Sequence, residues 1–254
     1  MTLILLALAA AFQGAPSPSA EAQLRSCTAL IKESPERAIA AADAWRLKGG
    51  SLDARHCLGL AFAAASRWAP AATAFDQAAR EAETKKDNRA ADFWTQSGNA
   101  WLAGGDAAQA IKAFDAALAV PALRAELRGE VYLDRARAGV ALGNLAGARA
   151  DLDQGLSLVA VDPMAWYLSA ALSRRQGDLA RAQKDIAKAV ELAPREPMIL
   201  LEAGNIAGIG GDVPAAKALY VRAAQADPES AIGRAAAAAL AANGPPEEAA
   251  PKAN

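Results

Sequence analysis

The sequence predicts an all-α fold that is built as a repeated array of helices. Roughly 70 of the 254 residues are alanine, the strongest helix former, whereas the residue types that favour strands are scarce. The same residue types also recur at a fixed interval, so that Gly177 is followed by Gly211 and Ala182 by Ala216. A constant interval of about 34 residues is typical of helix pairs that stack on one another.

The start of the chain, residues 1–22, has the order of an export signal. An apolar run from Leu3 to Phe12 is too short to span a bilayer of ~30 Å as a helix. The breaker-rich stretch Gly14–Ser19 follows, and Ala20-Glu21-Ala22 then offers an A-x-A cleavage site. Met1-Thr2 lacks the lysine or arginine that usually begins an export signal. Either the amino terminus alone supplies the positive charge, or the true start codon lies upstream. We expect residues 1–22 to be removed on export, which leaves a soluble periplasmic or secreted protein without a membrane span; an uncleaved first helix is the alternative.

Six repeat units and a last helix are expected after the signal. Ser34-Pro35 and Asp162-Pro163 are helix starts in which a capping side chain precedes a proline. Aspartates in the Gly-Asp turns are placed to cap the second helices by accepting hydrogen bonds from unpaired N–H groups, and these are Asp106, Asp178 and Asp212. The repeat domain is expected at residues 23–243, with units at 23–50, 52–85, 91–124, 129–162, 163–196 and 197–230, a capping helix at 231–243 and a disordered polar tail at 244–254.

Each unit contains a small residue in the middle of its first helix and a large residue in its second. The small residue allows the second helix to approach closely, and the large residue fills the space between units. The small residues are Gly59, Gly98, Ala136, Ala170 and Gly204, and the large residues are Phe75, Phe114, Leu152, Ile186 and Tyr220. Glu83–Arg89 lengthens the connection between the second and third units and is expected to be a solvated helix end and loop.

These positions resemble the tetratricopeptide repeat, whose pattern is W-x2-L-G-x2-Y, then A-x3-F, then A, then P. The best local match consists of Trp94, Ser97, Gly98, Trp101, Ala110, Phe114, Ala117 and Pro121. The resemblance covers roughly residues 22–230. It implies a right-handed superhelical solenoid of antiparallel helix pairs, of an exported bacterial type, whose first helices line a concave groove that binds peptides.

Counting helical positions onto that groove gives the candidate partner-binding residues. Asn99 and Asn205 each follow a packing glycine, and their amides can both donate to and accept from an extended peptide. Arg137 and Arg174 are suited to bind a carboxylate in bidentate fashion. The family's clamp for acidic C-terminal peptides is not reproduced, because Thr95 stands where a lysine is wanted. The full set is Thr95, Asn99, Glu130, Arg137, Tyr167, Arg174 and Asn205.

Catalysis and metal binding are not predicted. The single histidine, His56, adjoins Cys57, but neighbouring residues on a helix point about 100° apart, so a paired nucleophile and base is disfavoured. The sequence contains no recognised catalytic, nucleotide-binding or zinc-binding spacing. The net charge of −1 gives no reason to expect nucleic acid as a partner. We therefore predict a protein that is not an enzyme and that uses no cofactor or metal.

The two cysteines carry more information than the histidine. Cys27 and Cys57 fall on the first helices of the first two units, and neighbouring first helices pack side by side in this kind of array. An exported chain would allow a disulfide, which we favour over the alternative of two buried thiols.

The sequence as a whole predicts a non-enzymatic scaffold that binds a protein or peptide in its concave groove. Two other interpretations remain open. The alanine-rich stretch Ala231–Ala242 also suits a structural segment of a larger envelope assembly that docks through its solenoid ends. A small-ligand carrier or unrecognised enzyme would need a deep pocket with perturbed ionisable groups.

Overall fold

The computed structural model describes residues 19–121 and 123–242. These residues form thirteen α-helices and no strand, which confirms the predicted fold class. The helices are α1 (Ala20–Glu33), α2 (Pro35–Leu47), α3 (Ser51–Ala64), α4 (Trp68–Lys85), α5 (Ala90–Ala103), α6 (Ala107–Ala119), α7 (Ala125–Ala141), α8 (Leu145–Leu158), α9 (Pro163–Arg175), α10 (Leu179–Leu192), α11 (Pro197–Ile209), α12 (Val213–Ala226) and α13 (Ala231–Ala242).

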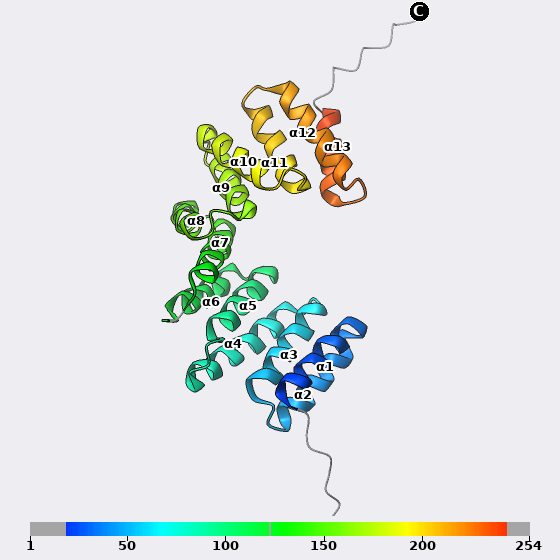
Figure 1. Cartoon of the computed structure of the whole chain (residues 1–254), viewed down its shortest axis with the longest axis vertical. Helices are drawn as coiled ribbons and strands as arrows, with labels where there is room; N and C mark the ends of the chain where they lie inside the picture. The colour runs from blue at the N-terminus through cyan, green and yellow to red at the C-terminus, as the bar shows by residue number, and fades with distance from the viewer. Residues whose placement is uncertain (1–18, 122, 243–254) are drawn as a thin grey trace, which may run out of the picture.

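The helices stack in chain order into a curved ribbon. Figure 1 shows a C-shaped molecule with α1 and α13 near its two ends and with α5 and α7 on the inner side of the curve, inside α6 and α8. Each odd-numbered helix from α5 to α11 also contacts the next odd-numbered one. The inner surface is therefore built from first helices of successive pairs.

The turns between paired helices follow the predicted chemistry. Gly105, Gly177 and Gly211 have φ angles of 83°, 79° and 84°, a left-handed conformation in which a side chain would be strained. The aspartate after each glycine caps the next helix: Asp178, for example, accepts a hydrogen bond from the N–H of Arg181 at 3.0 Å. Asp106 and Asp212 cap α6 and α12 in the same way. The capping predictions, including those for Ser34 and Asp162, are confirmed.

Pairs are held together where a glycine on the first helix faces a ring on the second. A Cβ atom on Gly98 would lie 2.4 Å from the ring of Phe114, and one on Gly204 would lie 2.5 Å from the ring of Tyr220. Gly59 and Phe75 are related in the same manner, at 2.5 Å. Alanines fill most of the remaining core. Small residues therefore set the close spacing of the helices, as the sequence pattern predicts.

Two regions depart from the regular unit. Helix α4 has 18 residues and runs to Lys85, so part of the inserted Glu83–Arg89 segment is helical; the segment also forms ion pairs, because Arg89 contacts both Asp87 and Asp53. At the other end, α13 packs on α12 and α11. Gly233 allows this packing, since a Cβ there would lie 1.9 Å from the carbonyl oxygen of Asp227.

The predicted signal segment lies mostly outside the described residues. Its proposed cleavage site, Ala20–Ala22, forms the first turn of α1, and Ser19 caps that turn by accepting a hydrogen bond from the N–H of Ala22 at 3.2 Å. Among the helices that the structure describes, none is long and apolar enough to cross a bilayer.

Candidate functional site: the inner surface of the solenoid

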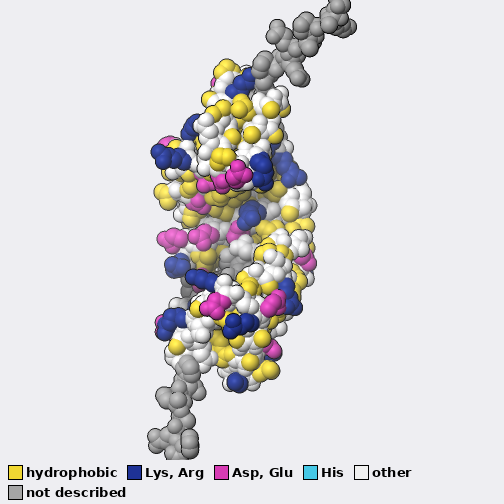
Figure 2. Space-filling model, turned by 90° about the vertical axis from the view of Figure 1, so that its right-hand side faces the viewer, with side chains coloured by type: hydrophobic (Ala, Val, Ile, Leu, Met, Phe, Trp, Pro, Cys, Tyr) yellow, Lys and Arg dark blue, Asp and Glu magenta, His cyan; other side chains and the backbone are white. Residues whose placement is uncertain are grey.

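The inner surface is made of equivalent positions on successive first helices. One row, which recurs at the repeat interval, consists of Asn99, Asp134, Leu168 and Glu202. A second row consists of Thr95, Glu130, Met164 and Met198, and a third of Arg137, Ala171 and Asn205. Figure 2 looks onto the open side of the molecule, whose middle is hollowed and bordered by both acidic and basic side chains.

A polar chain joins α5 to α7 on this surface. The amide of Asn99 donates to the carboxylate of Asp134 at 2.8 Å, and Arg137 forms an ion pair with the same carboxylate at 2.9 Å. Arg137 is still about half exposed, with 53% of its side chain accessible. Two of the predicted binding residues are therefore partners of one acid, Asp134, which is not itself among the predicted residues.

A second polar chain joins α9, α11 and α12. Arg174 donates to Glu202 through Nε at 2.6 Å and through Nη2 at 3.3 Å, although Glu202 is only 6% exposed. Asn205 donates to the same carboxylate at 3.2 Å and accepts from the hydroxyl of Tyr220 at 3.1 Å. The bidentate carboxylate that the sequence predicts for Arg174 is thus supplied by the chain itself. Burial and the nearby Glu202 raise the pKa of Tyr220.

A hollow of about 590 Å³ lies where α7, α9 and α11 meet on the inner surface. Tyr167 contributes to it, and burial together with the charge of Glu202 raises the pKa of its hydroxyl. The lining residues are Glu130, Leu133, Asp134, Arg137, Asp162, Met164, Tyr167, Leu168 and Met198. A more apolar hollow of about 410 Å³ adjoins it, between Arg137 on α7 and Ala171 and Arg174 on α9.

Thr95 differs from the other predicted residues. Its side chain is only 8% exposed, and its hydroxyl donates to the carbonyl oxygen of Ala91 at 2.8 Å within the same helix. Thr95 therefore contributes packing in α5 rather than an open polar group, which corrects its proposed place among the ligand contacts. The other six residues are half-buried or exposed on the inner surface.

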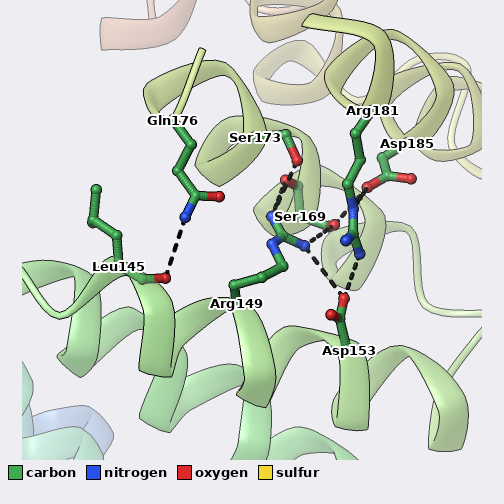
Figure 3. Close-up of polar contacts among 8 residues, drawn as sticks. All are labelled: Leu145, Arg149, Asp153, Ser169, Ser173, Gln176, Arg181 and Asp185. Carbon is green, nitrogen blue, oxygen red and sulfur yellow. Dashed lines mark hydrogen bonds and ion pairs between the residues drawn. The ribbon is translucent and has the colours of Figure 1, made fainter. Parts of the chain in front are cut away.

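A network of hydrogen bonds and ion pairs joins the second helices α8 and α10 through the first helix α9 (Figure 3). Arg149 on α8 donates to the hydroxyl of Ser169 on α9 at 2.7 Å and to that of Ser173 at 3.1 Å. Ser169 in turn donates to the buried carboxylate of Asp185 on α10 at 2.5 Å. Arg181 contacts both Asp185 and Asp153, which is on α8. This network links two successive helix pairs and is satisfied internally, so it holds the array together.

Another hollow, of about 830 Å³, lies between α4 and α6 on the side of the second helices. Trp94 and Trp101 form part of its wall, and the indole of Trp94 donates to Glu83 at 2.8 Å while Arg80 lies over its ring. Burial raises the pKa of Asp76, which also lines it.

The predicted cysteine pair is close in space. The structure contains a disulfide between Cys27 on α1 and Cys57 on α3, with their Cα atoms 6.1 Å apart.

The neighbouring His56 is half-buried against the rings of Phe75 and Phe93, and burial lowers its pKa. With its neighbour committed to the disulfide, His56 has no adjacent thiol to activate. The described residues contain no group of three or more His, Cys, Asp or Glu side chains placed to hold a metal ion.

Comparison with known proteins agrees with this architecture. The family model described as "Tetratricopeptide repeat" matches residues 165–196, which contain most of α9 and α10. The protein has a tetratricopeptide-repeat fold. No curated protein matches the chain.

Two solved structures of similar extent share this tetratricopeptide-repeat fold. One is PilF of Pseudomonas aeruginosa, which is 17% identical with a TM-score of 0.67 over 86% of this chain and 96% of that one. The other is PilW, described as a widely conserved type IV pilus biogenesis factor, at 20% identity and a TM-score of 0.68 over 85% of this chain and 97% of that one. YrrB, described as a tetratricopeptide-repeat protein with an unusual peptide-binding site, is 17% identical with a TM-score of 0.53 over 77% and 96% of the two chains.

Asp134 and Glu202, the two acids that organise the inner surface, are not among the residues predicted from the sequence. A signal was present for both. Asp134 is 35 residues after Asn99, so the two occupy equivalent positions on neighbouring first helices. Glu202 is 28 residues after Arg174, which places it one or two helical turns earlier on the next first helix.

Proposed function

We propose that this protein is a non-enzymatic scaffold that binds a protein or peptide partner on its inner surface. The observation that carries the proposal is the pair of adjoining hollows formed by α7, α8, α9 and α11, lined by exposed polar groups and by methionine, tyrosine and leucine side chains. An open surface of this composition suits a chain segment. The peptide-binding site named in the description of YrrB supports the same class of partner.

We further propose that the protein acts in the periplasm or cell envelope after export. The apolar run Leu3–Phe12 and the Ala20–Ala22 site support this proposal, and a disulfide between Cys27 and Cys57 suits an oxidising compartment. The mass of the protein purified from its own cells tests export. Loss of the segment that ends near Ala22 is expected, and a chain that keeps this segment would contradict signal cleavage.

Partner binding is tested by filling the inner hollow without altering charge. Ala171 lines the smaller hollow and is half-buried, so Ala171→Trp should block access. Ala116 is a half-buried alanine that lines the large hollow between α4 and α6, and Ala116→Trp is therefore a matched control. Both variants are first compared with the wild type by circular dichroism and thermal unfolding.

Each purified protein then captures partners from an envelope extract of the source cells. A partner retained by the wild type and by Ala116→Trp but lost by Ala171→Trp is the expected result. A partner retained equally by the wild type and both variants would contradict binding on the inner surface. The solenoid ends, including the exposed face of α13, would then become the favoured docking sites.

A further inference from the structure

The hollow of about 590 Å³ combines a negative charge with an adaptable apolar lining. Three acids line it, Glu130, Asp134 and Asp162, but only one cation, Arg137. Asp134 forms an ion pair with Arg137 at 2.9 Å, so those two charges compensate each other. The hollow is thus left with an excess of two negative charges.

The two remaining acids are open to an external partner. Glu130 is exposed on α7, and the structure gives it no ion pair with any described residue. Asp162 caps α9 by accepting a hydrogen bond from the N–H of Met164 at 2.8 Å, which uses one of its carboxylate oxygens and leaves its charge unpaired. A cation placed between these acids would meet no competing basic side chain except Arg137, which is already paired.

The rest of the lining is suited to aliphatic chains. Met164 and Met198 occupy equivalent positions on α9 and α11, and Tyr167 stands beside them. Methionine side chains are unbranched and polarizable, so they adjust to irregular apolar surfaces. The stem of a lysine or arginine is itself apolar and packs on such a surface while its charged end reaches an acid.

We infer that this hollow binds a basic segment of the partner, in which a lysine or arginine meets Glu130 and Asp162 and a neighbouring apolar side chain lies on Met164 and Met198. The inference rests on the proposed function, because it assigns a partner chemistry to the same surface. Charge complementarity sets the specificity: a basic segment is steered toward the hollow, and an acidic segment is repelled by it.

Three synthetic peptides of equal length test the assignment. One contains Lys, Leu, Ser and Gly in equal shares, the second has Glu in place of Lys, and the third has Gln in place of Lys. Each has blocked ends and a neutral dye, and binding to the full chain is measured by fluorescence anisotropy. We expect the lysine peptide to bind more tightly than the glutamine peptide and at least about tenfold more tightly than the glutamate peptide, with affinity that falls as salt is added.

Glu130→Gln/Asp162→Asn removes both charges while preserving shape, and asparagine still caps α9. The matched control is Glu33→Gln/Glu229→Gln, which changes the net charge by the same amount at two exposed positions that are distant in sequence from the hollow. We expect the first variant to weaken binding of the lysine peptide roughly threefold to tenfold, as two partly exposed charge contacts would. The control should leave affinity unchanged.

The possible outcomes separate this inference from the proposed function. Equal or tighter binding of the glutamate or glutamine peptide would overturn the assignment of a basic partner. So would an equal effect of the two double variants, because it would show a net-charge effect without a site. The lysine peptide could fail to bind while Ala171→Trp still abolishes capture of the envelope partner. That result would support binding on the inner surface and would overturn the assignment of a basic partner. If the lysine peptide does not bind and Ala171→Trp leaves capture of the envelope partner unchanged, both the inference and the proposed function fail.

Discussion

The first helix pair, α1 and α2, and the fifth, α9 and α10, follow one plan but are held in the array by different means. In the first pair only Cys27, Ala38 and Ala42 are buried. In the fifth pair nine residues are buried, and they include Ser169 and Asp185 of the network around Arg149. Among the described residues, the first pair has a neighbouring pair on one side only, and its link to α3 includes a disulfide. A helix pair with little buried area is therefore stabilised by a covalent link, whereas an inner pair is held by packing and hydrogen bonds.

The largest expected effect comes from removing the disulfide. Cys27→Ser/Cys57→Ser opens a loop of 30 residues, which in the chain-entropy model lowers the free energy of unfolding by roughly 3–4 kcal/mol. Because repeat arrays unfold locally, amide hydrogens of α1 and α2 should exchange much faster while those of α9 and α10 stay protected. Reductant should reproduce this effect in the wild type and have none on the variant. Faster exchange along the whole array would show that the first pair is not a separate unit.

A smaller effect is expected from breaking the network that joins α8, α9 and α10. Asp185→Ala removes the acceptor of Ser169 and a partner of Arg181. The buried hydroxyl of Ser169 is then left without its acceptor, at a cost of roughly 1–3 kcal/mol in the free energy of unfolding. Urea unfolding measures this change. Asp153→Ala is the control, because Asp153 is 45% exposed and its ion pairs are worth less than about 1 kcal/mol. Equal costs for the two variants would contradict the role assigned to the buried carboxylate.

The smallest effects distinguish the two pairs through their helix caps. Ser34 caps α2 and Asp178 caps α10, and replacing either by alanine should cost about 1 kcal/mol. In reduced protein the first pair is expected to be detached already, so Ser34→Ala should no longer change the global unfolding midpoint in urea, whereas Asp178→Ala should still lower it. If Ser34→Ala retains its full effect after reduction, the first pair folds with the rest regardless of the disulfide.

Local features of the fold could be predicted because they depend on one repeat at a time. A Gly-Asp turn specifies both a left-handed residue and a cap, as at Gly177 and Asp178. A glycine opposite a ring specifies a close approach, as at Gly98 and Phe114. These requirements are met within a single repeat, so the sequence states them directly.

The chemistry of the inner surface was harder to predict because it depends on contacts between repeats. Whether Arg174 is open or paired depends on Glu202, which is one repeat away and nearly buried. Counting along a single helix placed Thr95 in the groove but could not show that its hydroxyl donates within its own helix. Aligning the repeats with one another, so that equivalent positions are compared, would have exposed the Asn99–Asp134 contact.

Binding of a partner on the inner surface is tested most directly by site-specific photo-crosslinking in the source cells. A photoreactive phenylalanine derivative is introduced at Ala171 on the inner surface or, in a second strain, at Ala116 in the hollow between α4 and α6. We expect a discrete adduct, larger than the protein itself, from position 171 and none from position 116. An adduct only from position 116, or none from position 171 under conditions in which the partner is captured, would contradict binding on the inner surface.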